Sequence, residues 1–181
     1  MNENAGEFRN ILFRYLILIL LSFNGLFVFY LVFTPLTIYP SYFLLNSIFG
    51  ATLDYGNAVI HVGDVPVEMI KACIAGSAYY LLLIFNLATP GIKTPKRLKI
   101  IAFSFLIFLL ANILRIVALT AMYISGSPLF DITHIATWYF GSVILVMAIW
   151  FYKVKTYKIR GIPFYSDIKF LYKHSLLGRK S

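Results

Sequence analysis

The stretch Ile100–Ile124, IIAFSFLIFLLANILRIVALTAMYI, holds one charged residue, Arg115, among 25 consecutive positions. The hydrocarbon core of a bilayer is about 30 Å thick, and an α-helix needs about 20 predominantly apolar residues to cross it. The stretch therefore predicts a transmembrane helix. Because a charged side chain inside a membrane is costly and is paired or functional by default, Arg115 is also the first candidate for a functional residue.

Three further segments have the same character, and the composition of the chain agrees with them. The 181 residues are 60% hydrophobic and 13% charged, about half the charge of an ordinary soluble domain. We expect an all-α integral membrane protein with four transmembrane helices, at about residues 11–33, 70–88, 100–124 and 132–152. The first helix is too long for a signal-peptide core and is expected to remain as an anchor.

The basic residues predict the orientation of these helices. Of the 16 Lys and Arg residues, 14 lie at the start of the first helix, between the second and third, or after the fourth. Segments 34–69 and 125–131 contain neither Lys nor Arg. By the positive-inside rule both termini are cytoplasmic and these two segments face outward, as in a multi-pass protein of the cell membrane.

The same distribution decides what the net charge of +9 means. The basic residues flank membrane spans, and no nucleic-acid-binding motif is present, so the charge indicates topology and contact with anionic membrane lipids rather than nucleic acid. Residues 1–152 are expected to form a single membrane-embedded domain. Residues 153–181 are expected to form a basic cytoplasmic tail, with a short amphipathic helix at Asp167–Leu177.

The outward-facing segment, residues 34–69, has an organisation of its own. Ser41–Thr52 is apolar but too short to span a membrane, and it predicts an interfacial or partly inserted helix that begins after Pro40. Val59–Val67 alternates around the turn pair Gly63-Asp64 and predicts a small outward-facing hairpin, with a plain connecting loop as the alternative. Pro66 restricts the second strand of such a hairpin to an edge.

Cys73, Arg115 and His134 are expected to meet near the outer face of the membrane. At 1.5 Å per residue, Cys73 lies about 5 Å below the outer end of the second helix, and His134 lies at about the same depth in the fourth. Arg115 is about 13 Å deep in the third helix, and its long side chain extends outward. Asn112, three residues earlier on the same helical face, is expected to hydrogen-bond Arg115.

Taken singly, these residues have ordinary explanations, since a lone cysteine packs as a small apolar residue and a histidine at a helix end makes interfacial hydrogen bonds. Together they fit covalent catalysis. A Cys73 thiolate is the nucleophile, Arg115 stabilises the thiolate or an oxyanion, and His134 is the general acid and base. The single cysteine and scattered histidines show no metal-ligand spacing, so neither a metal nor another cofactor is expected.

The chain resembles the exosortase/archaeosortase family of membrane-embedded cysteine transpeptidases over roughly Ser41–Gly141. Its most specific feature is the order Cys, Arg, His on successive helices. The usual family element has a glycine two positions after the cysteine, whereas Ile74 and Ala75 precede Gly76 here. The motifs that carry the resemblance are LLNSIFG (Leu44–Gly50), YGNAVIHVGDVPVEM (Tyr55–Met69), KACIAG (Lys71–Gly76), NILRI (Asn112–Ile116), His134 and Gly141.

The resemblance implies that Cys73, Arg115 and His134 are the catalytic set of a sortase-like transpeptidase or protease. Substrates of the family are exported, membrane-tethered proteins that end in a short motif, a transmembrane helix and a basic tail, and they are transferred to a lipid or other amine-bearing acceptor. Two alternatives remain open. One is a small-molecule-binding subunit of a membrane transporter, and the other is an assembly factor in which the polar residues pack helices.

Overall fold

A computed structural model describes the backbone of residues 2–159 and 161–174, with the side chains of residues 2–5 and 24 left out. Residues 160 and 175–181 of the predicted tail lie outside the described residues. The chain is mostly helical, with one small sheet. The elements in order are α1 (Asn2–Phe49), β1 (Thr52–Asp54), β2 (Val59–Val62), β3 (Val65–Glu68), α2 (Lys71–Ile74), α3 (Gly76–Leu87), α4 (Thr94–Ile124), α5 (Phe130–Ala136), the π-helical segment η1 (Thr137–Gly141), α6 (Ser142–Tyr157) and α7 (Tyr165–His174).

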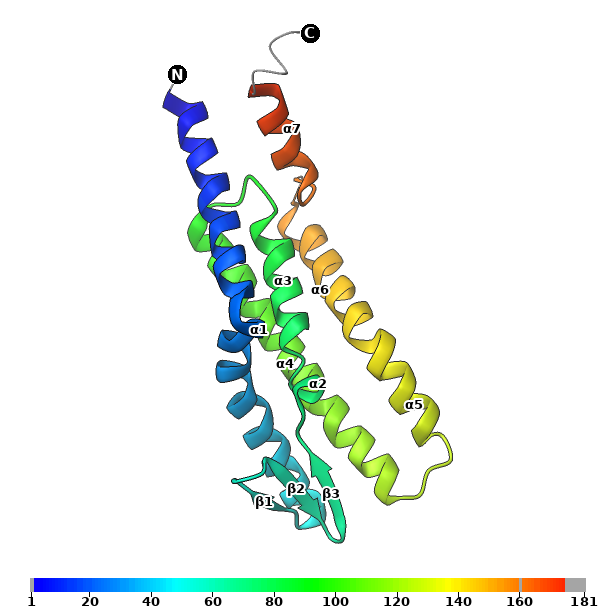
Figure 1. The fold of residues 1–181 in the computed structure, drawn as a ribbon. Helices are drawn as coiled ribbons and strands as arrows, with labels where there is room; N and C mark the ends of the chain where they lie inside the picture. Colours follow the sequence, from blue (N-terminus) through cyan, green and yellow to red (C-terminus); the bar gives the residue numbers. More distant parts are fainter. Residues whose placement is uncertain (1, 160, 175–181) are drawn as a thin grey trace.

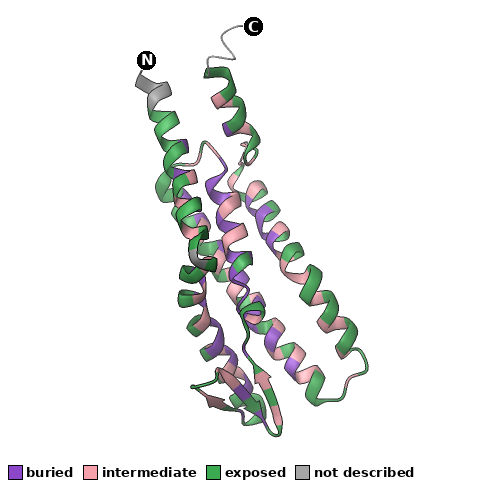
Figure 2. Cartoon of the chain, viewed as in Figure 1, coloured by how far each residue is buried: buried purple, intermediate pink, exposed green. Residues whose placement is uncertain are grey.

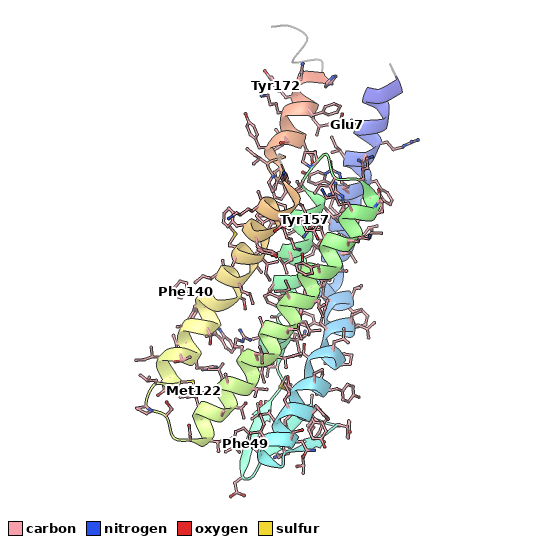
Figure 3. The ribbon with its side chains drawn as sticks, turned by 180° about the vertical axis from the view of Figure 1, so that it is seen from behind. Glu7, Phe49, Met122, Phe140, Tyr157 and Tyr172 are labelled. Atoms are coloured by element: carbon pink, nitrogen blue, oxygen red, sulfur yellow. The ribbon has the colours of Figure 1, made fainter. Side chains whose placement is uncertain are left out.

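The long helices run side by side and give the molecule two distinct ends (Figure 1). The beginning of α1, the α3–α4 connection and α7 lie at one end, whereas the sheet and the α4–α5 connection lie at the other. Figure 3 shows Glu7 and Tyr172 at the first end and Phe49 and Met122 at the second. Within residues 2–159 and 161–174, the basic segments therefore gather at one end, opposite the sheet.

The first helix is longer than the sequence predicts. The expected helix at Ser41–Thr52 is wrong as a separate element, because α1 continues through Pro35 and Pro40 without ending. In an apolar segment a helix still satisfies nearly all backbone polar groups, so proline does not force an end there. The interruption comes instead at Gly25 and Leu26, whose φ angles are +62° and +63°.

Three helical stretches among the described residues are long and apolar enough to cross a membrane: Gly25–Phe49, Thr94–Ile124 and Phe130–Tyr157. The structure thus supports a helical membrane protein, but four spans are not confirmed. The expected span at 70–88 is divided at Ala75, which takes a left-handed conformation (φ 58°, ψ 40°) between α2 and α3. The resulting apolar pair, Lys71–Leu87, is shorter than the candidate spans.

The predicted hairpin is confirmed and belongs to a larger antiparallel sheet in the order β1-β2-β3. Val62 pairs with Val65 across Gly63-Asp64, and Pro66 lies on the edge strand, as expected. Strand β1 is not predicted from the sequence, because a strand of three residues is too short to show an alternating pattern. Ile60 and Val62 of β2 are buried, so this face of the sheet closes the end of the helical bundle.

An aromatic cluster joins α1, α3 and α4. Tyr79 of α3 is fully buried, and its ring stacks on Phe33 of α1 with 3.5 Å between centroids. Phe105 and Phe108 of α4 meet the same ring edge-on, at 5.5 and 4.9 Å. In Figure 2 burial concentrates where α1, α3 and α4 face one another, whereas the α5–α6 leg is largely exposed. This leg therefore offers an apolar surface to surrounding lipid.

A polar cluster holds the tail against the opposite end of the bundle. Arg14 of α1 forms an ion pair of 2.8 Å with Asp167 of α7, and the two side chains are only 5% and 2% exposed. Arg14 also donates to the carbonyl of Leu87 at the end of α3 (2.6 Å), and Tyr15 donates to Asp167 (3.2 Å). The ion pair and the Tyr15 hydrogen bond therefore tie the beginning of α7 to α1.

Helix α6 continues to Tyr157, past the helix end predicted at about residue 152. Lys153 is fully buried within the bundle and donates to the carbonyl of Ile100 (2.6 Å). Nearby, the buried Arg97 donates to the carbonyls of Asn86 and, at 2.9 Å, Thr89. Arginine at a helix C-terminus is favoured by the helix dipole and satisfies carbonyls that have no partner in the helix.

The ion pair gives a stability prediction. Replacing Asp167 by Asn should destabilise the protein by about 3–5 kcal/mol, because Arg14 is then buried without a counter-ion. Lys169→Gln, at an exposed position of the same helix, should change stability by less than about 0.5 kcal/mol. The measurement is thermal unfolding in detergent micelles. Equal melting temperatures for Asp167→Asn and Lys169→Gln would show that α7 is not held by this pair.

Candidate functional site

A cavity of about 450 Å³ lies between the β3–α2 segment, α4 and α5. Its walls include Cys73 of α2, Arg115 of α4 and His134 of α5. The three residues predicted from the sequence are thus brought to one place by three separate helices. The other lining residues are Val65, Pro66, Val67, Glu68, Met69, Ile70, Ala72, Ile116, Leu119, Thr120, Tyr123, Phe130, Thr137 and Trp138, so the walls are mainly apolar.

Cys73 lies in the single turn of α2. Its amide donates to the carbonyl of Ile70 (2.9 Å), and its thiol, which is half-buried, lies 3.8 Å from the carbonyl oxygen of Glu68. The turn ends at Ala75, whose left-handed backbone separates α2 from α3. Because α2 does not continue directly into α3, Cys73 lies in a short helical corner, residues 71–75, and not inside a long helix. This corner lines the cavity.

Asn112 fixes the position of this corner. Its side-chain amide donates to the backbone carbonyl of Cys73 at 2.7 Å, and the residue is only 2% exposed. The expectation that Asn112 hydrogen-bonds Arg115 is wrong. The two residues are close on α4, but Asn112 is buried under α2, where a free carbonyl is available, while Arg115 extends along a neighbouring wall.

Arg115 is a cation for which the described residues provide no counter-ion. One guanidinium nitrogen donates to the hydroxyl of Ser142 on α6 at 3.4 Å, which is a long hydrogen bond, and the buried Nε has no partner within the described residues. The one ion pair found in that part of the chain is Arg14–Asp167 at the other end of the molecule. Arg115 and Cys73 are near enough to interact electrostatically. The guanidinium therefore retains donors for a ligand or a reacting group.

His134 is held between aromatic rings. Its ring stacks on Phe130 at 5.4 Å and meets Trp138 edge-on at 5.7 Å, and both neighbours also line the cavity. No hydrogen bond to the imidazole is found within the described residues. The helix widens to a π-helix directly after this turn, at Thr137–Gly141. Such π-helical turns are frequent at functional sites, where they redirect side chains.

Sequence reasoning missed several residues around these three. Phe130 and Trp138 lie four residues before and after His134, so helical spacing alone places them on its face and would have identified them. Ser142 could not be identified in this way, because its contact with Arg115 joins two helices, α6 and α4, and no local sequence pattern predicts such a contact. The contribution of β3 to the cavity wall likewise depends on how the sheet is set against the helices.

A second, more polar hollow of about 500 Å³ adjoins the first and shares Pro66, Glu68, Met69 and Ile70 with it. Asp54 on its wall accepts hydrogen bonds from the Asn57 side chain and the Gly56 amide, and these bonds hold the pKa of its carboxyl below the usual value. Within residues 2–159 and 161–174, no group of three or more His, Cys, Asp or Glu side chains is placed to hold a metal ion.

Comparisons of the chain with known protein families, with curated proteins and with solved structures find no match.

The left-handed corner after Cys73 gives a prediction about local strain. Ala75→Gly should stabilise the protein by about 1 kcal/mol, because a left-handed backbone costs a residue with a Cβ about 1–2 kcal/mol and costs glycine little. Gly76→Ala is the contrasting change. A Cβ at this position would lie 2.8 Å from the Tyr30 ring, so this variant should be destabilised.

The readout for both variants is thermal unfolding in detergent, followed by tryptophan fluorescence. Lower stability of Ala75→Gly would contradict the left-handed corner, since it would mean that the backbone at residue 75 has an ordinary helical conformation.

Proposed function

We propose that the protein is a sortase-like membrane transpeptidase or peptidase with Cys73 as its nucleophile. The observation that carries the proposal is that Cys73, Arg115 and His134 come from three helices and line one cavity. A thiol, a guanidinium with free donors and an imidazole are the groups that acyl transfer through a thioester needs. The resemblance to the exosortase/archaeosortase family supports the same assignment.

In the first half-reaction the Cys73 thiolate attacks the carbonyl carbon of the scissile peptide bond. The carbonyl oxygen takes the negative charge, and the free donors of Arg115 stabilise it in the tetrahedral intermediate. The C–N bond then breaks, His134 gives a proton to the leaving amine, and an acyl thioester remains on Cys73. Asn112 is a positioning residue in this scheme, because it holds the carbonyl of Cys73.

In the second half-reaction an amine or water attacks the thioester carbonyl. His134 accepts the proton of the incoming nucleophile, a new C–N or C–O bond forms, and Cys73 leaves as thiolate. The product is a protein joined to the acceptor, which we propose to be a lipid or other amine-bearing molecule, or a free carboxylate if water is the nucleophile. No cofactor takes part in these steps.

We further propose that both termini are cytoplasmic and that the cavity opens toward the outer face of the cell membrane. The support is the absence of Lys and Arg from segments 34–69 and 125–131, which form the end of the molecule that carries the sheet. The substrates in this arrangement are exported proteins that remain tethered by a C-terminal helix. Their basic tails stay on the cytoplasmic side.

A second function is favoured by Arg115 alone. The cavity of about 450 Å³ contains a guanidinium that has no acidic partner among the described residues. It is also of a size to bind a small anion, as in a small-molecule-binding transporter subunit. In that case Cys73 has no chemical task, and its replacement leaves uptake intact. The nucleophile test below separates the two functions.

If Cys73 is the nucleophile, a thioester with the substrate should form on its sulfur. In cells that express the wild-type chain, Cys73 should carry an acyl group that neutral hydroxylamine removes, since hydroxylamine cleaves thioesters. Mass spectrometry of the Cys73 peptide measures it, and the released acyl group identifies the substrate. Cys73→Ala should stop removal of C-terminal helices from the same membrane proteins while the folded protein remains abundant. Continued processing in Cys73→Ala cells would refute covalent catalysis by this residue.

Arg115 and His134 should differ in how their replacement acts. Arg115→Lys keeps the charge but loses the planar fork of donors, and it should slow cleavage about 10²–10³-fold, the loss typical of removing one oxyanion donor. His134→Ala should slow cleavage about 10²–10⁴-fold, the usual contribution of general acid–base catalysis. Cleavage rates of Cys73-dependent substrates in membranes are the measurement.

Ile132→Ala, at an exposed position of α5 outside the cavity lining, is the control and should retain activity. Full activity of Arg115→Lys, together with loss of folded Arg115→Ala, would assign Arg115 a purely structural role.

A further inference from the structure

The free edge of β3 borders the cavity that contains Cys73. In the sheet order β1-β2-β3, the strand β3 pairs with β2 on one side, and no strand of the described residues pairs with its other side. Val65 to Glu68, the whole of β3, line the cavity. In Figure 1, β3 is the strand of the sheet nearest α4. An unpaired strand edge is a ready template for another extended chain.

The register shows which backbone groups of β3 are available. Met69 donates to Ala58 across the hairpin at 3.1 Å, so these two residues form a hydrogen-bonded pair. Hydrogen-bonded and non-hydrogen-bonded pairs alternate along an antiparallel ladder. The adjoining pair, Val59 and Glu68, is therefore of the non-hydrogen-bonded kind. Both the N–H and the C=O of Glu68 consequently point away from β2.

The same alternation applies two residues earlier, where Pro66 pairs with His61. The carbonyl of Pro66 points outward like that of Glu68, while its nitrogen carries no hydrogen and leaves no donor unsatisfied. Pro66 and Glu68 are both exposed. The edge thus offers the Pro66 carbonyl and the Glu68 amide and carbonyl to an incoming strand.

The outward carbonyl of Glu68 also lies close to the nucleophile, since the Cys73 sulfur is 3.8 Å from its oxygen. Neighbouring strands in a sheet lie about 4.7–4.9 Å apart. A chain paired with the outer edge of β3 therefore passes through the cavity within one strand spacing and reaches the Cys73 thiol. Arg115 and His134 lie on the walls of the same space.

We propose that the substrate binds as an extended peptide that adds a strand to the outer edge of β3, with the Pro66 carbonyl and the Glu68 amide as its main-chain partners. The proposal rests on the proposed function, because it assigns the substrate segment and its conformation. Recognition through backbone hydrogen bonds gives affinity with tolerance of side-chain identity, and side-chain sites on alternate residues add selectivity. A folded helical segment cannot bind in this way, so the peptide ahead of the substrate's membrane helix is extended.

The test uses acetylated alanine peptides that end in a chloromethyl ketone, with one to four alanines, on the full-length protein in membranes. The Cys73 sulfur bonds to the methylene carbon and chloride leaves, and mass spectrometry follows the rate. We expect the rate to rise with peptide length. N-methylation should slow the four-alanine peptide about 3- to 10-fold at alternate positions only, because alternate amides of a paired strand face β3. A rate independent of length, or equal effects of N-methylation at every position, would overturn the proposal.

Two variants complete the design. Glu68→Pro removes an amide hydrogen that the hairpin does not use and should abolish the dependence on length, whereas Glu68→Gln keeps the amide and should retain it. If Glu68→Pro does not fold, the N-methylation series on the wild-type chain decides alone. The outcomes are separable from those of the proposed function, since alkylation needs only a thiol. Length-independent alkylation of a protein that still forms the Cys73 thioester rejects strand addition alone.

Discussion

The arrangement of the site depends on the hydrogen bond from the Asn112 side chain to the carbonyl of Cys73. A one-turn helix such as α2 has carbonyls without helical partners, and a buried carbonyl left unpaired costs about 1–3 kcal/mol. Asn112 supplies the missing donor from α4. The same hydrogen bond therefore satisfies the carbonyl of Cys73 and fixes the position of the nucleophile. The left-handed residue Ala75 then allows α3 to continue into the core, where Tyr79 joins it to α1 and α4.

Much of the fold and the candidate site can be predicted from local patterns. Apolar length identifies α4, and alternation around Gly63-Asp64 identifies the hairpin. The positions of Cys73, Arg115 and His134 on successive predicted helices indicate that they lie close together, and they line one cavity. What local patterns do not contain is the backbone geometry at single residues. The left-handed backbone at Ala75 shortens the second apolar helix. An alanine between apolar neighbours gives no indication in the sequence that its φ angle is positive.

Contacts between distant segments form the other part that sequence reasoning did not supply. The ion pair between Arg14 and Asp167 joins two segments that are far apart in the sequence, and it ties the beginning of α7 to α1. A charged residue within an apolar helix indicates that it has a partner of opposite charge or a functional role, but the sequence does not show which residue that partner is. Arg115 also lies within an apolar helix, but it has no acidic partner among the described residues. Arg14 therefore stabilises the contact between α1 and α7, whereas the Arg115 guanidinium remains available to a ligand in the cavity.

The proposed function depends on Cys73 of α2 and His134 of α5 lining the same cavity. Because Cys73 is the single cysteine of the chain, the variant His134→Cys contains one defined pair of thiols. A short bifunctional maleimide should join the two, so that the fragments made by protease cleavage between α2 and α5 stay linked. Ile132→Cys, exposed on the same helix, should not become linked. Separate fragments from His134→Cys, or equal linking in both variants, would contradict the shared cavity.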